Sequence, residues 1–154
     1  TEDGWLCTGD QGVEDNKGFL TITGRVKDIF KTDKGKYVAP APIENELSKS
    51  TLIEQVCVVG ANLPQTMALV VLSEEAKGKN KNEVDKELEE LATSVNKGLE
   101  KHERMKKVVV MNEEWTVEIN LLTPTLKVKR NILEKQKQDA YQNWYQQKES
   151  VVWE

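Results

Sequence analysis

The chain has 154 residues, a net charge of −4 and 38% hydrophobic residues, which fits one globular domain, alone or with a piece of another. No apolar run approaches the ~18–20 residues of a membrane span, and the N-terminus lacks the basic start and apolar stretch of a signal peptide. A single histidine and two distant cysteines, Cys7 and Cys57, argue against a zinc site and a Ser-His-Asp triad. Cysteines without metal-ligand spacing indicate a reducing, cytoplasmic setting. The start, TEDGWLCTGD, begins within a pattern and lacks Met, so we expect a fragment.

The N-terminal part of the chain is predicted to form β structure. FLTITG, at 19–24, alternates and is rich in β-branched residues. Residues 26–39 predict a β-hairpin, because two short extended stretches flank a glycine-containing turn. Pro42 then suits the first turn of a helix that presents Ile43 and Leu47 on one face.

The remaining chain predicts a small sheet and two further helices. Apolar runs of strand length stand at 56–60 (VCVVG), 67–72 (MALVVL) and 107–111 (KVVVM). Apolar residues at helical spacing over 82–102 predict an amphipathic helix, and a polar helix over 131–145 closes the chain. The expected fold class is α+β, a β-hairpin plus a small three-stranded sheet covered by helices. Such a fold buries a modest core but no deep cleft, so any chemistry is expected to take place against another body.

The first candidate site lies near the N-terminus. Asp10 ends the triplet Thr-Gly-Asp, and Arg25 follows Gly24 one strand later. An aspartate held in a glycine-flanked turn accepts hydrogen bonds from a diol or from backbone donors, and an arginine binds anions with two N–H groups. Each residue taken alone fits an ordinary structural turn equally well. The strand–GxxxxGK[ST]–helix pattern is absent, so the chain carries no phosphate-binding loop of its own.

The second candidate site is the locally basic segment LLTPTLKVKR. Lys127, Lys129 and Arg130 follow the stiffening Pro124 within an otherwise acidic chain. A lysine at the tip of a loop can neutralise charge that develops on a phosphate or carboxylate. The alternative is a solvated basic edge. Nucleic-acid binding is not expected, because the basic patch is small and no recognised nucleic-acid-binding pattern accompanies it.

Four segments, in this order, carry a family resemblance: DGWLCTGD (3–10), GFLTITGRVKD (18–28), KTDKGKYVAPAPIE (31–44) and LLTPTLKVKR (121–130). Together they resemble the adenylate-forming enzymes, most closely the long-chain acyl-CoA synthetase (fatty acid–CoA ligase) branch. No single tripeptide is specific, but the order and spacing of all four are, and they span essentially the whole chain. The resemblance implies that residues 1–26 end the large N-terminal adenylation domain and its linker, whereas residues 27–154 form the mobile C-terminal lid.

The resemblance also implies roles for the nucleotide-binding and catalytic positions. Asp10 would bind the ribose hydroxyls of ATP, and Arg25 would contact the ribose or a phosphate. Lys127 would be the catalytic lysine, which contacts the carboxylate substrate and the α-phosphate during adenylation. Many family members carry Gly directly before this lysine, where Leu126 stands here, and long-chain members commonly show TPTLK. Lys129 remains a rival for the role, since it would share a face with Lys127 in an extended segment.

Two further positions are implied to move. Lys27, or the neighbouring Asp28, would be the hinge about which the lid rotates after adenylation. The hairpin around Gly35, Lys36 and Tyr37 would then reach the site from the coenzyme A side.

The implied full-length protein is an acid–thiol ligase that converts a fatty acid into its coenzyme A thioester through acyl-AMP. ATP, coenzyme A and Mg²⁺ are the implied cofactors; the Mg²⁺ ligands, the acyl tunnel and the ATP-phosphate loop are expected in the missing N-terminal domain, the main partner. The fragment alone is expected to be inactive. A hydrophobic substrate fits peripheral association of the full-length enzyme with the inner face of a membrane. Two alternatives stay open: the lid of a luciferase-like or aminoacyl-adenylating enzyme, and a stand-alone anion-binding or interaction module that uses the basic segment.

Overall fold

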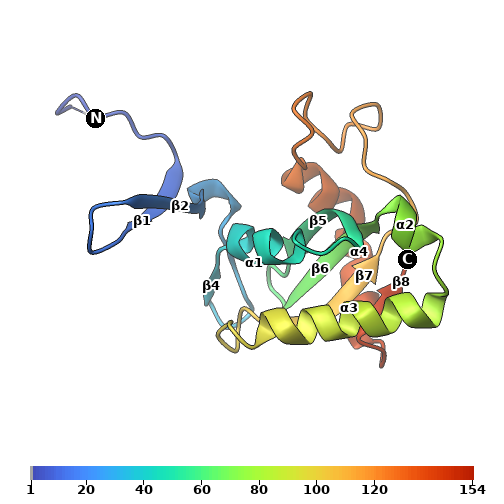
Figure 1. Cartoon of the computed structure of the whole chain (residues 1–154). Helices are drawn as coiled ribbons and strands as arrows, with labels where there is room; N and C mark the ends of the chain where they lie inside the picture. The colour runs from blue at the N-terminus through green and yellow to red at the C-terminus, as the bar shows by residue number, and fades with distance from the viewer. Residues whose placement is uncertain (1) are drawn as a thin grey trace.

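The structure is a computed structural model that describes residues 2–154. Its main body is a sheet with helices, and an N-terminal ribbon projects from this body (Figure 1). In chain order the elements are β1 (Asp10–Glu14), β2 (Leu20–Arg25), η1 (Val26–Asp28), β3 (Phe30–Lys31), β4 (Tyr37–Val38), α1 (Pro40–Leu47), β5 (Ile53–Val59), β6 (Thr66–Leu72), α2 (Glu74–Lys77), α3 (Lys81–Asn96), β7 (Met105–Val110), α4 (Arg130–Gln146) and β8 (Val151–Trp153).

The central sheet has the order β5-β6-β7-β8. Strand β5 is antiparallel to β6, whereas β6 is parallel to β7 and β7 is parallel to β8. The three predicted apolar strands are confirmed, but the central sheet has four strands and not the three that were expected. The additional strand, β8, pairs with β7 through Val108 and Val151. Three residues at the end of a chain show too little alternation to predict a strand, and β8 forms because β7 offers it an open edge.

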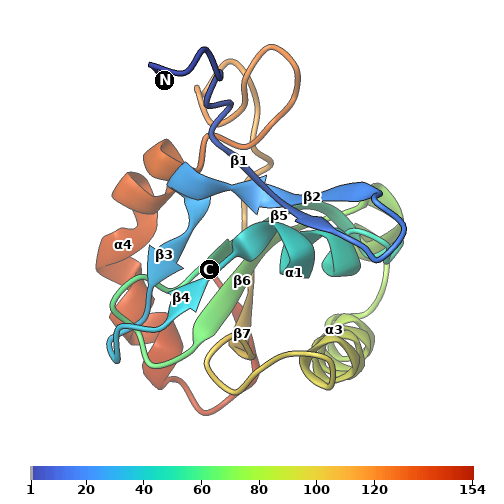
Figure 2. The ribbon, with the colours of Figure 1, turned by 90° about the vertical axis from the view of Figure 1, so that its left-hand side faces the viewer.

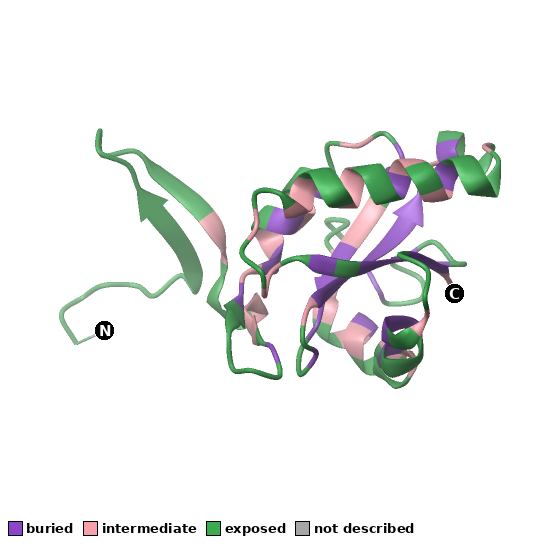
Figure 3. Ribbon diagram, turned by 90° about the horizontal axis from the view of Figure 1, so that it is seen from below, coloured by how far each residue is buried: buried purple, intermediate pink, exposed green. Residues whose placement is uncertain are grey.

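Side chains of the sheet alternate between two cores, so the sheet is covered on both faces. Val58 and Val70 pack with the residues of α1 and α3, whereas their neighbours Cys57 and Leu69 pack with those of α4. Figure 3 shows the buried residues concentrated in the sheet and on the inner sides of the helices. Burial on both faces explains why these strands read as continuous apolar runs.

The helix after the hairpin starts earlier than Pro42. Helix α1 begins at Pro40, where a residue without an N–H fits because the first helical N–H groups have no intrahelical partner. Ile43 and Leu47, four residues apart, are buried as predicted. None of the helices within residues 2–154 is long and apolar enough to cross a bilayer.

The amphipathic helix is shorter than the predicted span of 82–102. Asn80 caps α3 by accepting a hydrogen bond from the amide of Asn82. The helix ends at Asn96, whose side-chain amide bonds to both the carbonyl and the amide of Met105 at the start of β7. This pairing ties the end of α3 to the sheet and turns residues 97–104 into a connecting segment.

The ribbon of β1 and β2 differs from the body in its exposure. Its apolar side chains Val13, Phe19, Leu20 and Ile22 are all exposed. In Figure 3 the ribbon is coloured almost entirely as exposed surface. An isolated two-stranded ribbon is marginal in water, so these side chains are suited to packing against another body.

Candidate functional site

The basic segment forms a short hairpin, residues 121–129, here called the lysine loop. At its base the amide of Lys129 donates to the carbonyl of Leu121 at 2.8 Å. At its tip the amide of Thr123 donates to the carbonyl of Lys127 at 2.8 Å, and the amide of Lys127 donates to the Thr123 hydroxyl at 3.1 Å. Leu121 and Leu122 are buried, so the loop is rooted in the core while its tip is exposed (Figure 2).

A strained backbone stands directly before Lys127. Leu126 has φ +59°, and its side chain is exposed. Pro124, Thr125 and Leu126 form a three-residue turn, in which the last position is left-handed and favours glycine. Asn62 and Asn120 are the other two non-glycine residues with positive φ within residues 2–154, and asparagine tolerates this conformation well. The turn thus gives the physical reason why glycine suits the position that Leu126 occupies.

The three cations of the segment have different surroundings. Lys127 is exposed, and within residues 2–154 its ammonium forms no hydrogen bond or ion pair. The ammonium of Lys129 donates to the side-chain oxygen of Asn120. The expectation that Arg130 belongs to the basic tip was wrong: Arg130 is the first residue of α4, and its side chain is only 15% exposed. The accessible charge of the loop therefore belongs chiefly to Lys127.

Arg130 instead joins three elements beneath the loop. Its Nη2 lies 2.5 Å from Oε1 of Glu44 in α1, and its Nη1 donates to the carbonyl of Val58 and contacts the Cys57 sulfur in β5. The same Glu44 oxygen accepts from the amide of Val58 at 2.7 Å. Burial raises the pKa of the Cys57 thiol to about 12, so this sulfur is inert packing. Glu44 was missed because a single glutamate in a helix gives no sequence signal for a partner 86 residues away.

Asp10 and Arg25 are brought together across the N-terminal ribbon. They stand opposite each other in the pairing of β1 with β2, and Arg25 Nε lies 3.6 Å from Asp10 Oδ1. Both side chains are exposed, at 66% for Arg25 and 38% for Asp10. An exposed carboxylate beside a guanidinium still has oxygen lone pairs that can accept from a diol, while the cation can face a phosphate.

Lys27 and Asp28 lie in η1, the single 3₁₀ turn that connects the ribbon to the body. The amide of Val26 in this turn donates to the carbonyl of Gly9, the residue before β1, at 2.9 Å. Lys27 is exposed and Asp28 half-buried. A short turn at the junction of two bodies can absorb a large change in φ and ψ.

The hairpin of β3 and β4 carries Gly35, Lys36 and Tyr37. Gly35 has φ +72°, a conformation that the turn requires. Lys36 closes the turn through its carbonyl, which accepts from the amide of Thr32 at 2.9 Å. Tyr37 is exposed, and the ammonium of Lys31 lies 4.8 Å from the centre of its ring.

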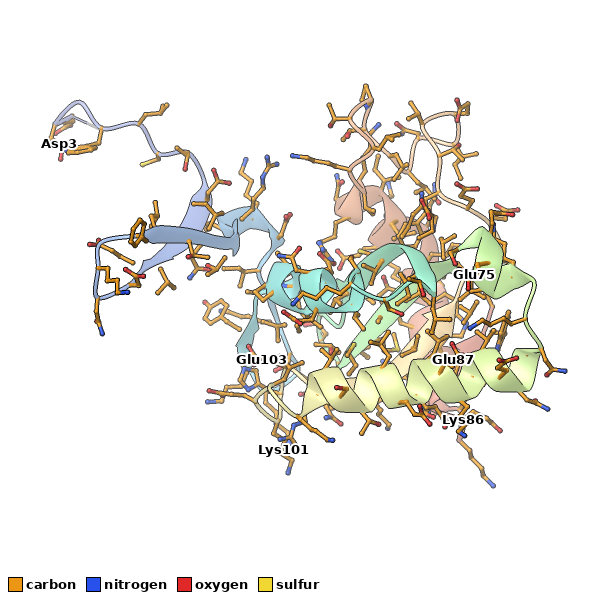
Figure 4. All side chains as sticks on the ribbon, in the orientation of Figure 1. Asp3, Glu75, Lys86, Glu87, Lys101 and Glu103 are labelled. Atoms are coloured by element: carbon orange, nitrogen blue, oxygen red, sulfur yellow. The ribbon has the colours of Figure 1, made fainter. Side chains whose placement is uncertain are left out.

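His102 is a contact of this hairpin that the sequence did not predict. Its Nε2 donates to the carbonyl of Tyr37 at 3.2 Å, while Nδ1 lies 3.5 Å from the carboxylate of Glu100. Its neighbours Lys101 and Glu103, labelled in Figure 4, lie in the same connection between α3 and β7. A histidine that contacts a hairpin 65 residues earlier leaves no local sequence pattern.

The candidate residues form separate groups on the surface. Within residues 2–154, no hydrogen bond or ion pair connects Lys127 with Asp10 or Arg25. Figure 1 shows the ribbon and the lysine loop as two separate projections of the molecule. The described part of the chain also holds no cluster of three or more His, Cys, Asp or Glu side chains suited to a metal ion.

Comparison with known proteins identifies the class to which this fold belongs. A family model described as the AMP-binding enzyme C-terminal domain matches residues 27–149. The chain belongs to this family of adenylate-forming enzymes, as its motifs predicted.

The similar proteins are much longer than this chain. "Long-chain-fatty-acid--CoA ligase FadD15" of Mycobacterium tuberculosis is 37% identical over 148 residues, covering 85% of this chain and 25% of the relative. "Long-chain-fatty-acid--CoA ligase 5" of Mus musculus is 38% identical, covering 94% of this chain and 24% of the relative. The solved adenylation domain of a Mycobacterium chelonae carboxylate reductase has a TM-score of 0.80 at 27% identity, and the match covers 96% of this chain and 24% of that domain. The chain thus spans about a quarter of the length of these proteins.

Proposed function

We propose that this chain is the C-terminal part of an ATP-dependent long-chain fatty acid–CoA ligase. In this proposal residues 1–26 complete the preceding adenylation domain and residues 27–154 form the mobile lid. The names of the curated relatives support the substrate class. The apolar side chains of the β1–β2 ribbon support its assignment to another domain, since Val13, Phe19, Leu20 and Ile22 are 58–68% exposed.

The observation that carries the proposal is the state of Lys127. Its backbone is fixed by hydrogen bonds at the tip of a rooted loop, while its ammonium is exposed. A lysine with a fixed backbone and an exposed ammonium suits a group that must extend into another domain and bind an anion there. Lys129 is less suited, because its ammonium is already bonded to Asn120.

In the first half-reaction, a carboxylate oxygen of the fatty acid attacks the α-phosphorus of ATP. A new bond forms between this oxygen and phosphorus, the bond to the bridging oxygen breaks, and pyrophosphate leaves. Lys127 would face the carboxylate and the α-phosphate, where it offsets the charge on the pentacoordinate phosphorus. Loss of one such contact costs roughly 10²–10³-fold in rate, as for a lost oxyanion donor.

The nucleotide would be held partly by the ribbon. Asp10 would accept hydrogen bonds from the ribose hydroxyls, and Arg25 would contact the ribose or a phosphate. Magnesium accompanies ATP in this chemistry, and its ligands are expected in the part of the protein that precedes this chain.

In the second half-reaction, the lid rotates at Lys27 and Asp28. Lys127 withdraws, and the hairpin around Gly35, Lys36 and Tyr37 approaches the acyl-adenylate. The thiolate of coenzyme A attacks the acyl carbon, the bond to the phosphate oxygen breaks, and AMP leaves with that oxygen. A linker of one 3₁₀ turn between the ribbon and the body supports this rotation.

The two alternatives differ from this proposal in measurable ways. The lid of a luciferase-like or aminoacyl-adenylating enzyme would act on another acid, and the named relatives favour the fatty acid. A stand-alone anion-binding module needs a cluster of exposed basic side chains. This alternative is less favoured because the Arg130 side chain is largely buried and paired with Glu44.

The decisive test joins this chain to its native upstream sequence and measures ATP-dependent formation of coenzyme A thioesters. Thioester formation with long-chain fatty acids, and none with amino acids, is the expected result. The chain alone, titrated with ATP and with coenzyme A in a calorimeter, is expected to show no stoichiometric binding. Tight binding by the chain alone, together with an inactive joined protein, would instead establish the stand-alone module.

A further inference from the structure

Arg130 and Glu44 form a set of polar contacts at the edge of the sheet, made through the two Nη atoms of the guanidinium and Oε1 of the carboxylate. Strand β5 is an edge strand, so the outward backbone groups of Val58 have no neighbouring strand to bond. The Glu44 carboxylate accepts from the Val58 amide, and the Arg130 guanidinium donates to the Val58 carbonyl and to the same carboxylate. Two side chains from distant elements thus occupy the place that another strand would take.

This set of contacts lies directly beneath the lysine loop. Lys127 is three residues before Arg130, and only Lys129, the cap residue of α4, separates the end of the loop strand at Val128 from that arginine. The N-cap of α4 has no side-chain hydrogen bond of its own, so the start of the helix depends on other contacts. The side chains of Arg130 and Glu44 are only 15% and 18% exposed, which shields their attraction from water.

The same contacts connect the loop to the side of the lid that follows the hinge. Glu44 lies in α1, which comes directly after the hairpin of β3 and β4. The chain therefore runs from the hinge through this hairpin to Glu44, and Glu44 contacts Arg130, which follows Lys127 by three residues. The base of the lysine loop is thereby joined to the part of the lid that directly follows the hinge.

Resting on the function proposed above, we propose that Arg130 is a positioning residue for Lys127. Paired with Glu44, it fixes the base of the lysine loop to the edge of β5, so that Lys127 reaches one defined place when the lid closes for adenylation. Arg130 itself touches no substrate. Its loss therefore impairs the half-reaction that uses Lys127 and spares the half-reaction from which Lys127 has withdrawn.

The experiment uses the joined protein and the variants Arg130→Lys and Glu44→Gln. Lysine keeps the charge but loses the guanidinium fork that reaches Val58 and Glu44 together, and glutamine keeps the size of Glu44 but loses its charge. Both variants are expected to lower fatty-acid-driven pyrophosphate exchange at least tenfold. Thioester formation from pre-made acyl-AMP should change less than threefold. Exchange of the Thr123 and Lys127 amides with deuterium should accelerate at least tenfold.

Controls separate the failure of this inference from the failure of the proposed function. Lys79→Met removes the ion pair between Lys79 and Glu87, whose side chains are 27% and 33% exposed. Glu87 lies in α3 (Figure 4), far along the chain from the lysine loop. This variant should leave both half-reactions and the loop amides unchanged. Lys127→Ala should itself impair pyrophosphate exchange alone, and if it does not, the proposed function fails.

If Lys127→Ala separates the half-reactions but Arg130→Lys and Glu44→Gln lower both equally, the pair is only structural and the positioning role is overturned. The same conclusion follows if the two loop amides keep their exchange rates in both variants. Should Arg130→Lys fold poorly, Glu44→Gln decides, because it leaves the Arg130 contacts with Val58 and Cys57 available.

Discussion

The strained turn before Lys127 predicts an inversion of the usual ranking of alanine and glycine. At an ordinary exposed position, glycine is about 0.5–1 kcal/mol less stable than alanine, because it has more freedom to lose on folding. Leu126 has φ +59°, where a side chain with a Cβ costs roughly 1–2 kcal/mol and glycine pays no such cost. Subtracting the entropic disadvantage of glycine leaves about 1 kcal/mol in its favour at this position.

The comparison of Leu126→Gly with Leu126→Ala isolates this backbone effect. Both variants remove the same side chain, which is 71% exposed and contributes little burial. The Gly variant should therefore unfold about 2–4 °C above the Ala variant, the shift that 1 kcal/mol produces in a domain of this size. Urea unfolding of the chain, followed by far-UV circular dichroism, gives the same difference as a free energy.

A matched pair at Glu90 serves as the control. Glu90 is exposed in the middle of α3, where Glu90→Ala should be more stable than Glu90→Gly by about 1 kcal/mol. Opposite signs at Leu126 and Glu90 are the predicted outcome. If Leu126→Gly is less stable than Leu126→Ala, the left-handed turn does not exist in solution and the description of the lysine loop is wrong.

Three further predictions concern helix α4 and the two cysteines. The Tyr141 hydroxyl is buried without a hydrogen-bond partner among the described residues, so Tyr141→Phe should keep the free energy of unfolding or raise it by up to about 1 kcal/mol; a loss larger than 1 kcal/mol in urea melts would contradict this. Burial raises the pKa of Glu134 in the folded chain above its unfolded value. The contribution of Glu134 to folding stability is therefore fully present below the ordinary carboxyl pKa and is lost as pH rises through the folded pKa. Glu134→Gln should therefore melt above the parent at pH 7 and level with it below about pH 4, and a difference independent of pH would refute the assignment. Cys7 is exposed and Cys57 is buried, so a thiol reagent at pH 8 should modify one sulfur in the native chain and the second only after denaturation; fast modification of both would show that the core around Cys57 opens.

Much of the fold was predictable because burial leaves a periodic trace in the sequence. The strands at β5, β6 and β7 are buried on both faces and therefore stand out as apolar runs, and α3 shows the stripe of a helix with one solvated face. Strand β8 was not predicted, since its three residues are too short a run to show alternation, and its pairing with the edge of β7 joins residues distant in the chain.

The candidate site was predictable only where residues act locally. The turn that holds Lys127 is encoded within the segment around it, and the pairing of Asp10 with Arg25 follows from two neighbouring strands. Arg130 was placed on the basic tip because a sequence gives the charge of a side chain but not the direction in which that side chain points. Its true partner, Glu44, is brought near by the packing of α1 against β5, which only the folded structure reveals.

The central claim is that Lys127 serves the adenylation half-reaction, and one comparison in the joined protein tests it most directly. Lys127→Ala and Lys129→Ala are each measured by fatty-acid-driven pyrophosphate exchange and by thioester formation from pre-made acyl-AMP. Lys127→Ala is expected to lower exchange roughly 10²–10³-fold while thioester formation is kept, and Lys129→Ala should change neither by more than a few-fold. Loss of exchange in Lys129→Ala with normal exchange in Lys127→Ala would contradict the account and give the role to Lys129.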